Sequence, residues 1–200
     1  MSKFRIILLA CLVFVLIAAI AEGADIMVYF NRGNTYFNDG KYEKAIREYN
    51  MVISEDQNFI DAYYNRGLAY YRKGDYEEAI SDFNKVIANN QKDAEIYHLR
   101  ALAHYKRGQY NKTIHDETKA VSINPNFADA YHNRGVAYAK GGQHDEAIED
   151  YNKAISIRQN YSEAYFSRGV AYTRKAASDF KKACEMGIQH ACDNLKQLSE

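Results

Sequence analysis

Tyrosine recurs at a constant spacing along most of this 200-residue chain. Five tyrosines stand 34 residues apart, at Tyr29, Tyr63, Tyr97, Tyr131 and Tyr165. The stretch that begins at Tyr63 is closely similar to the one that begins at Tyr131, and weaker copies begin at the other three. A fixed period in the range of about 20 to 50 residues indicates a repeat architecture, in which each unit packs mainly against its neighbours.

The pattern inside one unit predicts two packed helices. Small residues such as Gly67 and Gly135 would let the first helix approach the second closely, and this packing must offset about 1 kcal/mol for glycine in a helix. Asp75 and Glu78 predict an N-cap with a capping box at the start of the second helix. Between the two helices, where a left-handed C-cap is expected, each of the first four units has a glycine: Gly40, Gly74, Gly108 and Gly142.

The repeat resembles the tetratricopeptide family, over about residues 26 to 186. Counting Ile60 as position 1, that family has an aromatic at position 4, Gly or Ala at 8, Tyr at 11, Ala at 20 and an aromatic at 24. The second unit supplies all of these, as Tyr63, Gly67, Tyr70, Ala79 and Phe83. The third unit departs most, with Ala101, His104, Thr113 and Glu117. The resemblance implies an all-α fold, a right-handed superhelical array (α-solenoid) of helical hairpins.

The predicted organisation follows the period. It consists of a signal peptide or N-terminal anchor (1–23), repeat 1 (26–59), repeat 2 (60–93), repeat 3 (94–127), repeat 4 (128–161), a shortened repeat 5 (162–186) and a C-terminal capping helix (187–200). In the fifth repeat the segment between the helices is about five residues short and lacks its glycine. Either a very tight turn preserves the hairpin, or Glu163 to Glu185 form one long helix. The absence of Gly and Pro between Gly169 and Gly187 favours the long helix.

The N-terminal residues have the layout of an export signal. Lys3 and Arg5 precede an uncharged run from Ile6 to Ala21. Small residues stand at the spacing that signal peptidase reads, in Ala19-Ile20-Ala21 or, as a second option, in Ala21-Glu22-Gly23. We therefore expect the protein to be exported, and to be periplasmic or secreted after cleavage. An uncleaved membrane anchor is the alternative, and a buried core helix is a third.

Two cysteines would remain after cleavage, Cys184 and Cys192. Their surroundings resemble the disulfide-bridged helical repeats of some exported bacterial proteins, in which cysteines eight residues apart close a helix-Gly-helix corner. This resemblance implies a disulfide, with Gly187 ending the first helix. In one straight helix the two residues would be about 12 Å apart, too far to bridge. Two buried free thiols remain an alternative, and so does a metal or redox role, although the spacing fits no common motif.

In the tetratricopeptide family the first helix of each repeat lines a concave groove, chiefly through positions 2, 5, 9, 12 and 13. The resemblance therefore implies a partner-binding groove formed by Phe30, Asn34, Phe37, Tyr64, Leu68, Tyr71, Arg72, His98, Leu102, Tyr105, Lys106, His132, Val136, Lys140 and Phe166. Such an aromatic and aliphatic stripe suits an extended or helical peptide. The alternative is that part of the stripe packs between repeats. Acids at position 2 and bases at position 13 would give the groove two charged edges, which the helix dipole alone can explain.

Enzymatic motifs are missing from the sequence. It has no Gly-rich phosphate loop, HExxH or GxSxG. His98 and His132 recur at one position, but adjacent helices lie about 10 Å apart, which is too far for an easily shared metal. The formal net charge is zero, so the chain as a whole has no electrostatic attraction to nucleic acid or to an anionic membrane.

These observations predict no catalytic site, no cofactor and no metal. We expect an exported, non-enzymatic scaffold or adaptor that binds another protein or a peptide segment in the groove. It would contact a membrane only through an uncleaved N-terminal segment. The family's clamp for chaperone carboxylates is not expected, because Phe30, Glu95 and Leu99 replace its basic residues. The alternative function is a structural or assembly role, through self-association of the repeat ends or the C-terminal helix.

Overall fold

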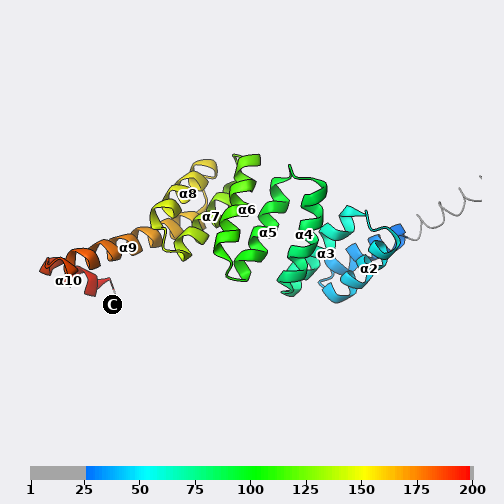
Figure 1. Ribbon diagram of the computed structural model, residues 1–200, viewed down its shortest axis with the longest axis horizontal. Coiled ribbons are helices and arrows are strands. Elements are labelled where there is room, and N and C mark those ends of the chain that lie inside the picture. The colour runs from blue at the N-terminus through cyan, green and yellow to red at the C-terminus, as the bar shows by residue number, and fades with distance from the viewer. Residues whose placement is uncertain (1–25, 199–200) are drawn as a thin grey trace, which may run out of the picture. The chain divides into compact units, whose positions relative to one another are not determined.

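The computed structural model describes residues 26–198, so the predicted signal peptide or anchor lies outside the described residues. Residues 26–38 are helical. The helices that follow are α2 (Tyr42–Glu55), α3 (Ile60–Lys73), α4 (Tyr76–Asn89), α5 (Ala94–Lys106), α6 (Tyr110–Ile123), α7 (Ala128–Lys140), α8 (His144–Ile157), α9 (Ser162–Glu185) and α10 (Gln189–Gln197) (Figure 1). No strand occurs within 26–198, and the all-α prediction is confirmed. None of the described helices combines the length and apolarity needed to cross a membrane.

The described residues divide into two compact units, 26–90 and 91–198. In the first unit α2 packs on α3, and α3 pairs with α4. In the second unit α5 pairs with α6 and α7 with α8, while α9 packs on α8 and carries α10. Short turns connect α3 to α4, α5 to α6 and α7 to α8, so each of these pairs forms a hairpin. The 34-residue unit of the sequence therefore corresponds to one helical hairpin.

The hairpins of repeats 1, 2 and 4 are closed by an aromatic ring lying directly on a glycine. A Cβ atom added at Gly67 would stand 2.7 Å from the Phe83 ring, and one at Gly135 would stand 2.8 Å from the Tyr151 ring. Both glycines are buried. No side chain fits in so little space, which confirms the predicted close approach of the two helices.

The turn between the two helices has the predicted left-handed glycine. It does not have the predicted capping box at the start of the second helix. Gly74 ends α3 with φ of 98°, in the left-handed region, as expected for a C-cap. Asp75 does stand at the N-cap position of α4, but its side chain makes no capping hydrogen bond. Its carboxylate instead accepts a hydrogen bond of 2.7 Å from Lys73 Nζ. The predicted capping box is therefore wrong, because the nearby cation offers the carboxylate a charge-assisted partner.

The shortened fifth repeat forms one continuous helix. α9 runs for 24 residues without a reversal near Arg174, which confirms the long-helix alternative. Figure 1 shows α9 extending beyond α8 to the corner where α10 begins. The turn is absent because its glycine and neighbouring residues are missing from the sequence, and nothing else interrupts the helix.

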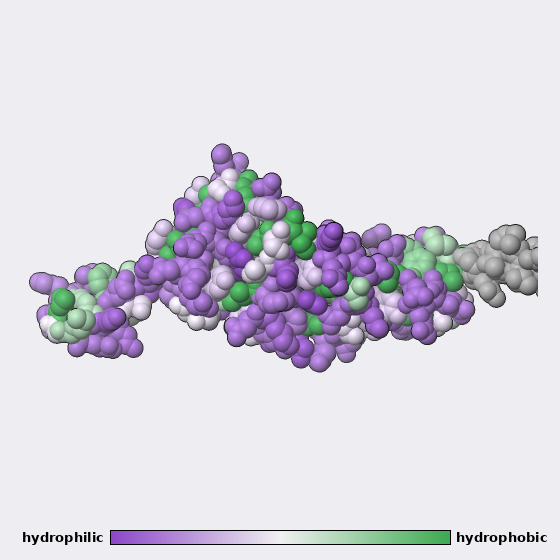
Figure 2. Space-filling view, turned by 45° about the horizontal axis from the view of Figure 1, so that its top comes forward, coloured by the Kyte–Doolittle hydropathy of each residue, from purple (hydrophilic) through white to green (hydrophobic). Residues whose placement is uncertain are grey.

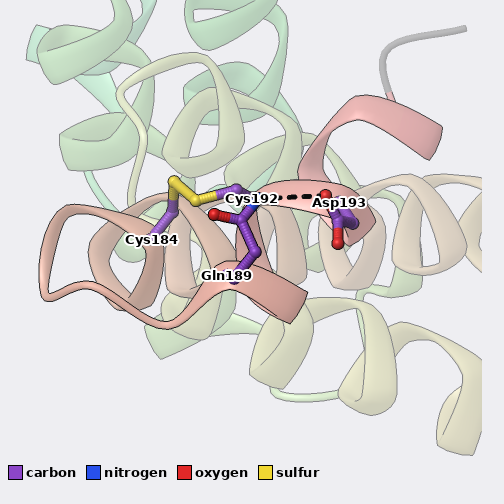
Figure 3. Close-up of a disulfide and its surroundings, with 4 residues drawn as sticks. All are labelled: Cys184, Gln189, Cys192 and Asp193. Atoms are coloured by element: carbon purple, nitrogen blue, oxygen red, sulfur yellow. Dashed lines mark hydrogen bonds between the residues drawn. A yellow bond between two sulfur atoms is a disulfide. The ribbon is translucent and has the colours of Figure 1, made fainter.

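A disulfide closes the corner between α9 and α10. Cys184 and Cys192 are bonded, and their Cα atoms lie 4.8 Å apart. The sequence left free thiols open as an alternative, whereas the structure pairs the sulfur atoms (Figure 3). Gly187, with φ of 92°, turns the chain. Gln189 Nε2 donates a hydrogen bond of 3.2 Å to Asp193 within the short α10.

The third repeat replaces the ring-on-glycine contact with a polar pair. Glu117 stands where the other complete repeats have an aromatic, and it is fully buried. Ala101 stands where they have glycine and is also fully buried. His98 Nδ1 lies 2.9 Å from the Glu117 carboxylate. By equivalence with the neighbouring repeats, the methyl group of Ala101 occupies the space that an aromatic ring at 117 would need.

The two departures of the third repeat should therefore be coupled. Glu117→Phe alone is expected to lower the free energy of unfolding by roughly 1–3 kcal/mol, because its ring would overlap Ala101. Ala101→Gly alone should cost about 1 kcal/mol through helix propensity. The double variant restores the contact of the other repeats, so it should be more stable than Glu117→Phe alone. Urea denaturation of all four proteins measures this cycle. A double variant less stable than either single variant would contradict the assignment.

Removal of the disulfide should loosen one corner only. Replacing Cys184 and Cys192 with serine is expected to weaken the docking of α10 by roughly 2 kcal/mol, because a loop of this length is no longer closed. Amide hydrogen exchange in α10 should accelerate, whereas exchange in α5 to α8 should stay as in the parent protein. Unchanged protection of α10 would show that packing alone holds the corner.

Candidate functional site

The predicted groove residues of the first unit are largely engaged in packing. The Phe30 ring lies 5.0 Å from that of Phe59, and the Tyr71 ring lies 5.5 Å from that of Tyr76. Asn34 is held by a polar contact, since its Oδ1 accepts a hydrogen bond of 2.8 Å from the Tyr49 hydroxyl. These three contacts lie within single repeats. The alternative of packing between repeats is seen at Asn34, whose Oδ1 also accepts a hydrogen bond of 2.9 Å from Asn65 of the next repeat. The role of these residues in partner binding stays a prediction.

In the second unit a pocket opens between α7 and α9. It has a volume of about 150 Å³ and is lined by Val136, Ala139, Lys140, Tyr151, Phe166, Ser167, Val170, Ala171 and Arg174. It brings together three residues that the sequence assigns to the groove, Val136, Lys140 and Phe166. Phe166 is 74% exposed, although aromatic side chains are usually covered.

The pocket has an apolar floor and a basic rim. Lys140 is the last residue of α7, and Arg174 lies midway along α9. Within residues 26–198 neither cation has a carboxylate partner. Two cations beside an apolar hollow can hold a ligand that combines an apolar group with an anionic one.

The remaining groove residues of the second unit lie outside this pocket. Tyr105 lies against Tyr110, with ring centroids 5.6 Å apart. His132 stacks on Tyr161 at 5.0 Å, and its Nε2 lies 3.2 Å from Ser167 Oγ. Burial lowers the pKa of His132 below its ordinary value. These contacts give the side chains packing roles, and within the described residues no group of three metal-ligating side chains gathers.

The buried pair in α5 and α6 combines a histidine with a carboxylate. His98 also stacks on Phe127 at 4.8 Å. Burial raises the pKa of Glu117 to about 7, although the hydrogen bond from His98 opposes this shift. The sequence analysis assigns His98 to the groove. It identifies Glu117 only as the residue that departs from the aromatic expected at position 24. Their contact was not anticipated, because glutamate occurs at its position in the third repeat alone and the pair therefore gives no periodic signal.

A recurring ion pair inside the hairpins was missed by sequence reasoning. Arg66 binds Asp82 through two hydrogen bonds of 2.8 and 2.7 Å, one to each carboxylate oxygen. The same bidentate pair recurs between Arg134 and Asp150, and Arg100 equally binds Asp116. The signal is present in the sequence, since arginine recurs every 34 residues at position 7 and an acid recurs at position 23.

One of the acidic residues predicted to form an edge of the groove is paired with an arginine. Asp129, at position 2 of the fourth repeat, accepts hydrogen bonds of 2.9 and 2.7 Å from Arg158. The Tyr161 hydroxyl donates a further one of 2.8 Å. Arg158 and Tyr161 hold the pKa of Asp129 below its ordinary value. This acid therefore fixes the start of α7 against the segment before α9.

Comparison with known proteins identifies the class of this fold. Family profiles described as TPR repeat match residues 33–74 and 103–142. Profiles described as tetratricopeptide repeat match residues 60–93 and 128–161. The chain belongs to the tetratricopeptide repeat family, an array of helical hairpins that serves as a scaffold for protein–protein interaction. Proteins of this family are generally not enzymes.

Solved structures show the same arrangement. A crystal structure of MamA protein is 29% identical, covers 88% of this chain and 91% of its own, and has a TM-score of 0.74. A second crystal structure of MamA is 30% identical, with coverages of 83% and 91% and a TM-score of 0.70. YrrB, described as a TPR protein with an unusual peptide-binding site, is 24% identical, with coverages of 90% and 96% and a TM-score of 0.68. No curated protein sequence matches the chain significantly.

The buried carboxyl of Glu117 should make stability depend on pH. Its pKa is about 7 in the folded protein and near the ordinary 4.5 in the unfolded chain, so the folded state binds the proton more tightly. Stability should therefore fall as the pH rises from about 4.5 through 7 and level off above it. Glu117→Gln cannot ionise and removes this contribution.

The measurement is the difference in free energy of unfolding between the parent protein and Glu117→Gln, from urea denaturation at several pH values. Other titrating groups are common to both proteins and largely cancel. A difference that stays constant between about pH 5 and 8 would show that Glu117 does not titrate in this window.

Proposed function

We propose that this chain is an exported scaffold that binds a peptide segment of another protein in the pocket between α7 and α9. The observation that carries the proposal is an exposed Phe166 beside an apolar hollow, together with two cations, Lys140 and Arg174, that have no carboxylate partner within residues 26–198. A single pocket of this size admits one side chain, so it suits a short linear segment better than a small-molecule substrate.

The chemistry of the rim specifies the partner. An apolar side chain of the peptide fills the hollow against Val136 and Val170, and an adjacent acidic side chain or terminal carboxylate lies between Lys140 and Arg174. The peptide-binding site named for YrrB supports a role of this kind in an array of the same fold. Most of the affinity comes from burying the apolar side chain, whereas the cations select for negative charge and speed association.

Export is the second element of the proposal. It is supported by Lys3 and Arg5 followed by the uncharged run from residue 6 to 21. The paired cysteines agree with an oxidising compartment, because disulfides persist there and are rare in reducing ones. Cell fractionation with N-terminal sequencing of the mature protein tests this element independently of peptide binding. A protein recovered in the cytoplasm with residues 1–23 attached would refute it.

Peptide binding can be tested without knowing the natural partner. The probe is a displayed library of random peptides selected on the purified protein, and the selected peptides should pair an apolar residue with a neighbouring acid. The variant Lys140→Glu, Arg174→Glu should bind them at least about tenfold more weakly, because the rim then repels the acid. Isothermal titration calorimetry measures the affinity.

The matched control is Lys153→Glu, which reverses an exposed charge on α8 outside the pocket. It should leave the affinity unchanged, and circular dichroism should show equal helicity in all proteins. Equal binding by parent and rim variant, or failure of the library to enrich any peptide, would refute the proposed pocket. Tyr105→Ala is a poorer probe, because Tyr105 packs on Tyr110 and its loss would disturb the hairpin.

A further inference from the structure

α9 contains both helices of a repeat, fused without the turn between them. Its first part, from Ser162 to Lys175, aligns with the first helix of the second repeat. Residues 176–180 then read Ala-Ala-Ser-Asp-Phe, where residues 79–83 of α4 read Ala-Ile-Ser-Asp-Phe. The five residues Gly-Asp-Tyr-Glu-Glu at 74–78, which form the turn and the first three residues of α4, have no counterpart. The second helix is therefore present in the sequence but cannot fold back onto the first.

The first half of α9 consequently lacks the cover that every complete hairpin has. Gly135 is buried beneath Tyr151, whereas the equivalent Gly169 is exposed, and a Cβ added there would meet no atom within 4 Å. Tyr165 and Tyr172 are 47% and 51% exposed, although their equivalents in α7 are half-buried. Beyond this part, the second half of α9 forms the narrow neck that joins α10 to the rest of the second unit (Figure 2).

The recurring ion pair is also split in the fifth repeat. Arg168 keeps the contact that the equivalent arginine makes to the preceding repeat, a hydrogen bond of 2.6 Å to Asn152. In the complete repeats this arginine also binds the aspartate of its own hairpin, as Arg66 binds Asp82. Here that aspartate is Asp179, which lies on the same helix and about 16 Å further along its axis. The arginine and the exposed aspartate cannot meet within one chain.

We infer that two copies of this chain pair through α9 in antiparallel orientation, so that each copy supplies the second helix of the other's fifth repeat. Three contacts of a complete hairpin would then form between copies: Gly169 with Phe180, Arg168 with Asp179, and Tyr172 with Ala176. The midpoint of each pair lies within one residue of Arg174. One two-fold axis near Arg174 therefore satisfies all three contacts twice, as a symmetric dimer requires.

Shortening a turn is a known cause of domain swapping, the exchange of an element between two copies. When the connection is too short for the chain to reverse, the two helices can pair only between copies. α10 is tied to the second half of α9 by its disulfide and would move with it to cap the other copy. Arg174 and Lys175 of both copies approach near the axis, but Lys175 is already neutralised by Asp145. The dimer does not depend on the proposed peptide pocket.

Restoring the turn provides the first test. Inserting Gly-Asp-Tyr-Glu-Glu, the sequence of 74–78, between Lys175 and Ala176 should let the hairpin close within one chain. The parent protein, expressed as the full chain and purified, is expected to have twice the mass of one chain by light scattering coupled to gel filtration. The insertion variant should have half that mass. A monomeric parent, or an insertion variant that stays dimeric, would overturn the inference.

Charge exchange between copies provides the second test. Arg168→Asp and Asp179→Arg should each weaken the dimer, because two like charges then face each other at both contacts. An equal mixture of the two variants should form a heterodimer with both ion pairs present, one in the original sense and one reversed. Lys182→Asp is the matched control, since the equivalent residues of complete repeats are exposed, and it should leave the mass unchanged. Affinity-tagged Arg168→Asp should retain Asp179→Arg but not a second Arg168→Asp chain. Failure of the mixture to associate would contradict the antiparallel register.

Discussion

The contact between a glycine in the first helix and an aromatic ring in the second determines the geometry of the hairpins. With a Cβ atom at Gly67 the Phe83 ring would have to move, because the two would stand 2.7 Å apart. The bidentate pair of Arg66 and Asp82 fixes the register beside this contact. Burial raises the pKa of Asp82 above its ordinary value, against the opposing effect of Arg66. A buried ion pair is weak evidence for stability, because removing both charges from water opposes their attraction.

In the third repeat both sides of the contact between glycine and aromatic ring have changed together. Its small residue is alanine instead of glycine, and a buried glutamate replaces the ring. The glutamate is tolerated because His98 hydrogen-bonds it from the first helix. A buried carboxylate would otherwise lose its hydration without compensation. The third repeat therefore differs at three positions that depend on one another, Ala101, Glu117 and His98. This mutual compensation explains why the most divergent repeat still has the common fold.

Much of this fold could be predicted from the period of the sequence. The period places Gly74 at the end of α3, and the missing turn residues after Arg174 predict the single long α9, because both depend on local backbone chemistry. The capping box at Asp75 failed because Lys73 competes for its carboxylate. The pair of His98 and Glu117 was missed because side-chain partners in different helices leave no local signal. The period of the sequence predicts which residues belong to the groove. It does not predict which of them pack against other side chains and which are exposed, because this depends on neighbouring residues that differ between repeats.

The exposed surfaces of the second unit share one origin in the shortened fifth repeat. In a complete array the first helix of a repeat is covered on one side by the preceding hairpin and on the other by its own second helix. α9 retains the first cover, through α7 and α8, and has lost the second. The pocket beside Phe166 lies on the side that faces α7, whereas the bare surface at Gly169 corresponds to the missing helix. The same deletion therefore exposes two sides of α9, one toward α7 and one toward the missing helix, and Arg174 borders both.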